Sequence, residues 1–124
     1  MTQALAIAAG GAAGALFRFW LASWVYARLG SGFPYGTLVV NVLGSLLMGF
    51  LYILLVERMT LEPVWRAVLL VGMLGAFTTF STFSIETFNL IESGQSVKAM
   101  LNMVLSLMLC ILAAWAGVLA GRQL

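Results

Sequence analysis

The sequence predicts an all-α membrane protein with four membrane-crossing helices, and three observations lead to this fold class. The chain has 124 residues, of which 63% are hydrophobic and only 8% are charged. A water-soluble fold of this size needs more polar surface than these residues supply. Four apolar windows are long enough for a bilayer core, which takes about 20 residues of helix, and short polar stretches separate them. We therefore expect one integral membrane domain over residues 1–124.

The four predicted helices cover about residues 4–26, 36–56, 64–91 and 98–121. The connections between them are rich in Gly, Pro, Ser and charged residues, which favour turns. Pro63 suits the first turn of the third helix, because its missing N–H would be unpaired there in any case. Short connections place each helix beside its predecessor, so we expect a four-helix unit.

The first, second and fourth helices carry small and polar residues at helical spacing. These residues are Gly10 and Gly14 in the first helix, Asn41, Gly44, Ser45, Gly49 and Tyr52 in the second, and Asn102, Ser106, Cys110, Ala114, Gly117 and Gly121 in the fourth. Small residues and hydroxyls let helices approach closely in lipid, and we interpret the glycines as packing residues. Since four helices fill their own interior with side chains, a pore requires association of subunits.

The basic residues give almost no preference for one orientation in the membrane. With four crossings, the termini and the middle connection share one side. The six basic residues divide equally, with Arg58, Arg66 and Arg122 on that side and Arg18, Arg28 and Lys98 on the other. Lys and Arg in short connections set orientation. Two interpretations stay open, either a weak bias that still selects one orientation or insertion both ways with pairing into an antiparallel homodimer.

The third apolar segment is longer than a straight crossing requires and contains a weak point. Gly72 and Gly75 are followed by five hydroxyl residues between positions 78 and 84. Because hydroxyls compete for backbone hydrogen bonds, we predict a break around Gly75–Thr79. At membrane depth the freed carbonyls must line a cavity or bind a cation. The alternative is an unbroken helix whose Ser and Thr contact neighbouring helices.

Two aromatic residues and one acid follow the predicted break. Phe80 and Phe83 project from the same helical face, and their positive ring edges could form a weak, dry anion site. Packing is the alternative role for both rings. Glu86 is the only acid well inside a predicted crossing, which makes it a functional candidate. For Arg18 we keep two roles open, snorkelling to the interface or forming a vestibule that attracts anions.

Several function classes do not fit this composition and are set aside. The chain has no histidine and a single cysteine, Cys110, so it offers no zinc-type ligand cluster. Its six basic residues are spread along the chain and form no patch for a phosphate backbone, which argues against nucleic-acid binding. No nucleophile–base pair is visible, so we do not expect an enzyme.

The third-helix run resembles the signature of the CrcB/Fluc fluoride channels. It reads Gly75-Ala-Phe-Thr-Thr-Phe-Ser-Thr-Phe-Ser84 and is followed by Glu86. The run Gly36-Thr-Leu-Val-Val-Asn41, with Gly44 beyond it, is similar to the second-helix motif of that family. Gly10, Gly11, Gly14 and Arg18 resemble its first helix, and Pro63-Val-Trp65 its middle connection. The resemblance covers essentially the whole chain.

This resemblance implies a dual-topology antiparallel homodimer whose third helix is broken at mid-membrane. It implies a structural Na⁺ on the dimer axis, held by backbone carbonyls that match Gly75 and Thr78. The resemblance also implies a fluoride pathway, with Arg18 at its vestibule. The pathway residues are Asn41, Phe80, Phe83, Thr79, Ser81, Ser106 and Glu86. Cys110 and Ala114 depart from the family, because related members carry hydroxyl residues there. Ala76 replaces a glycine found in some members.

The implied function is passive release of fluoride through a channel in the bacterial inner membrane. Hydrogen fluoride enters as a neutral acid and dissociates in the cytoplasm, and the pore lets the anion leave, which reduces its toxicity. One alternative is a small multidrug-resistance exporter, a proton-coupled antiporter that needs a carboxylate in its first helix. The first helix here carries Arg18 and no acid, although Glu86 could substitute. The other alternative is a non-transporting membrane scaffold subunit.

Overall fold

The computed structural model describes residues 2–124, and these residues fold into helices joined by short connections. Two of the helices are uninterrupted, and the other two crossings contain π-helical segments. The elements in order are α1 (Thr2–Leu29), α2 (Tyr35–Tyr52), the π-helical η1 (Ile53–Glu57), α3 (Pro63–Arg66), the π-helical η2 (Ala67–Leu74), α4 (Gly75–Phe77), α5 (Phe80–Glu92) and α6 (Ser96–Gln123).

Four stretches of this chain are long and apolar enough to cross a membrane, which confirms the predicted all-helical, multi-pass class. They are Thr2–Leu29, Tyr35–Glu57, Pro63–Glu92 and Ser96–Gln123. The helices predicted over about residues 4–26, 36–56, 64–91 and 98–121 lie inside these stretches, and each observed helix extends slightly further at both ends. The third stretch contains α3, η2, α4 and α5 in succession.

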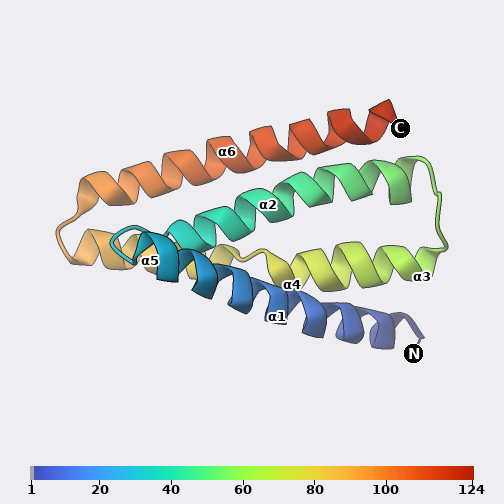
Figure 1. Cartoon of the computed structure of the whole chain (residues 1–124), viewed down its shortest axis with the longest axis horizontal. Helices are drawn as coiled ribbons and strands as arrows, with labels where there is room; N and C mark the ends of the chain where they lie inside the picture. The colour runs from blue at the N-terminus through green and yellow to red at the C-terminus, as the bar shows by residue number, and fades with distance from the viewer. Residues whose placement is uncertain (1) are drawn as a thin grey trace.

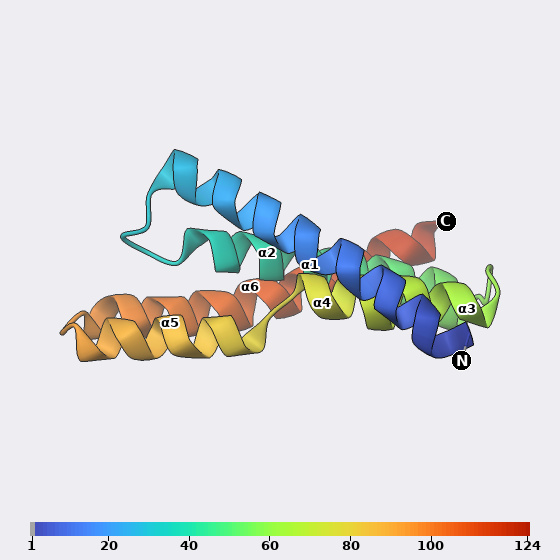
Figure 2. The same cartoon turned by 90° about the horizontal axis from the view of Figure 1, so that it is seen from below.

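The helices run up and down, and both ends of the chain lie at the same end of the bundle. Figure 1 shows the two termini beside the connection between η1 and α3, whereas the α1–α2 and α5–α6 connections lie at the opposite end. Figure 2 shows α1 crossing the other helices at an angle. The helix α2 packs along α6, and α1 packs along η2 and α4.

Two glycines end helices at that opposite end of the bundle. Gly30 follows α1 with a φ of +80°, and Gly94 follows α5 with a φ of +79°. A positive φ after the last helical turn is the usual conformation of a terminating glycine. The Gly30 N–H donates to the Tyr26 carbonyl at 2.8 Å, so the last turn of α1 is closed by a backbone hydrogen bond.

Close backbone contact between α1 and η2 depends on glycines in α1. A Cβ atom on Gly10 would overlap the carbonyl oxygen of Val68, and one on Gly14 would overlap the carbonyl oxygen of Met73. Larger residues would hold the helices apart. The packing role predicted for Gly10 and Gly14 is therefore confirmed.

The helix α6 buries small and polar residues and exposes large apolar ones. Its buried side includes Asn102 and Gly117, whereas Ile111 and Trp115 are 66% and 60% exposed. A Cβ atom on Gly117 would overlap the backbone of Leu46 in α2. This arrangement is the reverse of a helix on a water-soluble protein and suits a lipid-facing surface.

The third crossing is interrupted between α4 and α5. Thr78 has φ −84° and ψ 157°, and Thr79 has φ −150° and ψ 119°, so both residues are extended. Thr79 is the N-cap of α5, where its side chain accepts a hydrogen bond from the Thr82 N–H. The two extended residues lie at the end of the stretch 75–79 in which the sequence predicts a break.

Candidate functional site: two cavities beside the break

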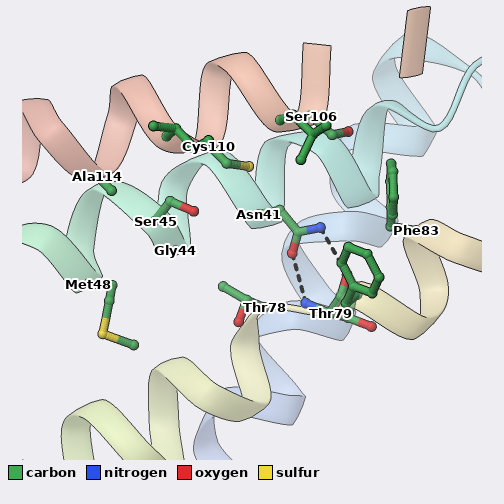
Figure 3. A pocket seen from close by; sticks show the side chains of 13 residues that line it. Asn41, Gly44, Ser45, Met48, Thr78, Thr79, Phe83, Ser106, Cys110 and Ala114 are labelled. Atoms are coloured by element: carbon green, nitrogen blue, oxygen red, sulfur yellow. Dashed lines mark hydrogen bonds between the residues drawn. The ribbon is translucent and has the colours of Figure 1, made fainter. Parts of the chain in front are cut away.

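Asn41 of α2 braces the extended residues by two hydrogen bonds to one backbone residue. Its Oδ1 atom accepts from the Thr79 N–H at 2.8 Å, and its Nδ2 atom donates to the Thr79 carbonyl at 3.0 Å. Figure 3 shows both bonds. The side-chain amide thus replaces the backbone partners that Thr79 would have in a continuous helix.

The break separates carbonyl groups of the preceding turn from their usual helical donors, and the Gly75 and Thr78 carbonyls are among them. In a continuous α-helix, the Gly75 carbonyl would accept from the Thr79 N–H and the Thr78 carbonyl from the Thr82 N–H. Here the Thr79 N–H donates to Asn41, and the Thr82 N–H donates to the Thr79 hydroxyl at 3.1 Å. Carbonyl oxygens with unused acceptor capacity are ligands that suit a hard cation such as Na⁺.

Acidic and thiol side chains of the described residues form no metal-binding group. Among residues 2–124, no three His, Cys, Asp or Glu residues gather closely enough to hold a metal ion. A cation near the break would therefore depend on neutral oxygen atoms. The Gly75 and Thr78 carbonyls fit this requirement by their chemistry.

A cavity of about 330 Å³ opens between α2, the break, α5 and α6, and we call it the α6-side cavity. Four of the predicted pathway residues, Asn41, Thr79, Phe80 and Phe83, line it, and Ser106 of α6 is a fifth. Thr78 also contributes to its wall. Among the residues that the structure describes, no charged side chain lines this cavity.

The two phenylalanines of α5 form a pair at the edge of the α6-side cavity. Their ring centroids lie 5.3 Å apart with an angle of 43° between the planes. Phe83 is partly buried, whereas Phe80 is 74% exposed. The rings are tilted, so their edges as well as their faces are presented to their surroundings.

The wall that α6 contributes becomes less polar along the helix. Ser106 lines the cavity near Asn41, and Cys110 and Ala114 follow at successive turns (Figure 3). The Ser106 hydroxyl donates to the Asn102 Oδ1 atom at 3.4 Å. Ser45 of α2 also lines the cavity, a position that the sequence assigned only to a packing stripe. Its spacing of four residues from Asn41 is the signal that could have placed it there.

A second cavity of about 280 Å³ lies on the other side of Thr79, and we call it the α1-side cavity. Arg18, Thr82 and Glu86 line it, together with Thr79, which therefore contributes to both cavities. The predicted pathway residues are thus divided, because Glu86 faces a different cavity from Phe80 and Phe83. Ser81 is exposed and lines neither cavity, although its hydroxyl lies 3.4 Å from that of Thr79.

Arg18 connects α1 to the end of α4. Its Nε atom donates to the Ala76 carbonyl at 3.1 Å. A cation close to the carboxyl-terminal end of a helix is favourable, because the last carbonyls carry partial negative charge. Arg18 therefore makes an interior contact at the break, besides lining the α1-side cavity.

Glu86 has one partnered and one unpartnered oxygen. The Tyr26 hydroxyl donates to its Oε2 atom at 3.0 Å. The Oε1 atom is buried and has no hydrogen-bond partner among residues 2–124. Tyr26 did not stand out in the sequence, because its hydroxyl reaches Glu86 only through the tertiary arrangement in which α1 and α5 both contact α2.

Comparison with known proteins extends these observations. A family described as CrcB-like protein, Camphor Resistance (CrcB), matches residues 5–118. A protein of Methylococcus capsulatus named fluoride-specific ion channel FluC is 55% identical over 119 residues, which are 96% of this chain and 52% of that protein. Relatives of the same name from Coxiella burnetii and Geobacter sulfurreducens are 53% and 48% identical, over 97% and 100% of this chain and 98% and 100% of their own lengths. The chain thus spans about half of the first relative and nearly all of the other two.

Proposed function

The chain belongs to the CrcB-like protein family, and we propose that it is a passive, fluoride-selective channel of the bacterial inner membrane. The relatives named as fluoride-specific channels support the substrate, and two of them match this chain over nearly their whole length. The structural observation that carries the proposal is the α6-side cavity, which combines neutral donors with aromatic rings beside interrupted backbone. The protein is a channel and not an enzyme.

The cavity lining suits a small anion that must bind weakly and leave quickly. Phenylalanine edges carry partial positive charge, and hydroxyl groups donate hydrogen bonds without fixed charge. Phe80 and Phe83 would offer the ring edges, and Thr79 and Ser106 hydroxyl groups lie nearby. Weak sites let an ion leave again, which conduction requires. A larger anion such as chloride would gain less from these donors, because its charge lies further from them.

Asn41 acts mainly by holding the pathway in shape. Both polar atoms of its side chain bond to Thr79, so the amide braces the break, and the second N–H of Nδ2 is left as a donor for the α6-side cavity. The braced residue, Thr79, borders both cavities. We assign Ser81 a minor part in the pathway, through its hydroxyl contact with Thr79.

The active unit in this proposal is an antiparallel homodimer with the break at mid-membrane. The equal division of six basic residues between the two sides supports insertion in both orientations. Phe80 is 74% exposed in one subunit, which leaves a pathway ring for a partner subunit to cover. A second subunit would also double the carbonyl groups available around a shared axis.

A structural Na⁺ at that axis is part of the same proposal. The Gly75 and Thr78 carbonyls of each subunit would hold it, because their usual helical donors are bound elsewhere. The ion would compensate the partial negative charge that these carbonyls bring into the low-dielectric membrane. It would thereby stabilise the broken helices of both subunits.

Fluoride efflux from liposomes that contain the purified protein tests the function directly. Rapid release of fluoride down its gradient, without a proton gradient and with little release of chloride, is the expected result. Proton-driven movement of a cationic dye in the same liposomes would instead indicate an exporter. Correctly folded protein that releases no fluoride would refute the proposal.

A further inference from the structure

Three helices meet at a hydrogen-bonded cluster around the hydroxyl of Tyr26. The hydroxyl of this α1 residue donates to Glu86 Oε2 of α5 at 3.0 Å. Its oxygen accepts from the Thr37 N–H of α2 at 3.4 Å. Hydrogen bonds to a charged group are stronger than those between neutral groups. The hydrogen bond from Tyr26 therefore fixes the position of the Glu86 carboxylate.

This pair stands at the boundary between two cavities. Tyr26 and Glu86 line the α1-side cavity, and both also line a cavity of about 480 Å³ near the α1–α2 and α5–α6 connections. The second of these cavities also includes Ser31 and Ser93. Tyr26 and Glu86 thus separate the α1-side cavity from the cavity near the α1–α2 and α5–α6 connections.

Other donors in the α1-side cavity could bind the same carboxylate. Arg18 and Thr82 line it with Glu86. Glu86 Oε1 is buried and unpartnered among the residues described, so this oxygen still lacks a donor. An anion that enters the cavity would need the same N–H and O–H groups.

We propose that Tyr26 is a positioning residue that keeps the Glu86 carboxylate away from Thr82 and from the Arg18 N–H groups that are not bound to Ala76, so that these donors stay free for a permeating anion. This inference rests on the proposed fluoride channel function. Without the Tyr26 hydroxyl, the carboxylate turns to the cavity donors and competes with fluoride for them.

The substitution Tyr26→Phe removes the hydroxyl and keeps the ring. In liposomes with the purified full-length protein, the fluoride concentration that gives half-maximal flux should rise about tenfold, the effect expected of one hydrogen bond to a charged group. The maximal flux should stay unchanged, because high fluoride overcomes a competitor. Tyr35→Phe is the matched control, since no hydrogen bond of the Tyr35 hydroxyl occurs within residues 2–124.

A second substitution removes the competing charge. In Tyr26→Phe combined with Glu86→Gln, half-maximal flux should return to the fluoride concentration measured for Glu86→Gln alone. If Glu86→Gln does not conduct, the dependence of flux on fluoride concentration in Tyr26→Phe alone tests the inference. An unchanged half-maximal concentration in Tyr26→Phe, or a maximal flux reduced at every fluoride concentration, would overturn the inference. Wild-type protein that passes no fluoride would instead refute the proposed function.

Discussion

Asn41 and Thr79 lie 38 positions apart in the chain, and the side-chain amide of the first residue pairs with the backbone N–H and C=O of the second at 2.8 and 3.0 Å. The pair lets a transmembrane segment leave the helical conformation without exposing the Thr79 backbone to lipid. An unsatisfied backbone group in the bilayer core is strongly unfavourable. The break between α4 and α5 therefore depends on Asn41 of α2 as much as on the residues of the third crossing.

Asn41→Leu should weaken the fold and reduce fluoride flux. Leucine has a similar size, but it leaves the Thr79 N–H and C=O unpaired, which destabilises a protein by about 1–3 kcal/mol for each buried group. Denaturant unfolding in detergent micelles and fluoride efflux from liposomes measure the two effects. Asn89→Leu is the control, since Asn89 is exposed on α5. Wild-type flux and stability in Asn41→Leu would show that the break does not depend on this brace.

Replacement of Phe80 and Phe83 by isoleucine should lower fluoride flux at least about tenfold, because aliphatic side chains lack the positive ring edge. The assembly should stay unchanged, so the variant should elute in detergent at the same volume as the unsubstituted protein in size-exclusion chromatography. Phe88→Ile is the matched control, since Phe88 lies on the same helix, is 52% exposed and lines neither cavity at the break. Normal flux in the double variant would indicate that the two rings only pack.

The four crossings and the tight glycine contacts could be predicted from the sequence, because each depends on local composition and helical spacing. Gly10 and Gly14 show this, since their separation alone places them on one face. The position of the break was predicted less sharply. Hydroxyl residues mark a weak stretch, but Asn41 of another helix selects Thr79 within it.

The division of the site into two cavities could have been anticipated only in part. Thr79, Thr82 and Glu86 are separated by three and four residues, which predicts a common face once α5 begins at Phe80. The pairing of Glu86 with Tyr26, 60 positions away, depends on how α1 and α5 are each placed against α2. No local pattern carries that information.

Removal of Na⁺ should abolish fluoride flux if the Gly75 and Thr78 carbonyls hold a structural ion. Long dialysis of liposomes against N-methylglucamine, a cation too large to replace Na⁺ among converging carbonyls, is the experiment. Flux should return when Na⁺ is restored. The control is a sample dialysed for the same time with Na⁺ present. Undiminished flux after complete exchange would count against the sodium site.

Thr87→Val should destabilise the contact between α5 and α6. The Thr87 hydroxyl accepts a hydrogen bond from the Asn102 Nδ2 atom at 2.8 Å, and Asn102 is only 2% exposed. Loss of the acceptor leaves a buried amide unsatisfied, which lowers the free energy of unfolding by about 1–3 kcal/mol. Ser84→Ala on the exposed side of α5 should change it far less. Equal effects would mean that another acceptor replaces Thr87.

Gly10→Ala and Gly11→Ala should change the free energy of unfolding in opposite directions, although the two residues are neighbours. A Cβ atom on Gly10 overlaps the Val68 carbonyl oxygen, which belongs to helical backbone and cannot rotate away, so α1 must move from η2 at about 1–3 kcal/mol. A Cβ atom on Gly11 meets the Gly72 carbonyl oxygen at an ordinary 3.9 Å. Alanine there should be neutral or stabilising by up to about 1 kcal/mol, because it favours helix over glycine. Thermal unfolding in the same detergent compares the variants. Equal stability would mean that α1 can separate from η2 freely, so that the contact does not define the bundle.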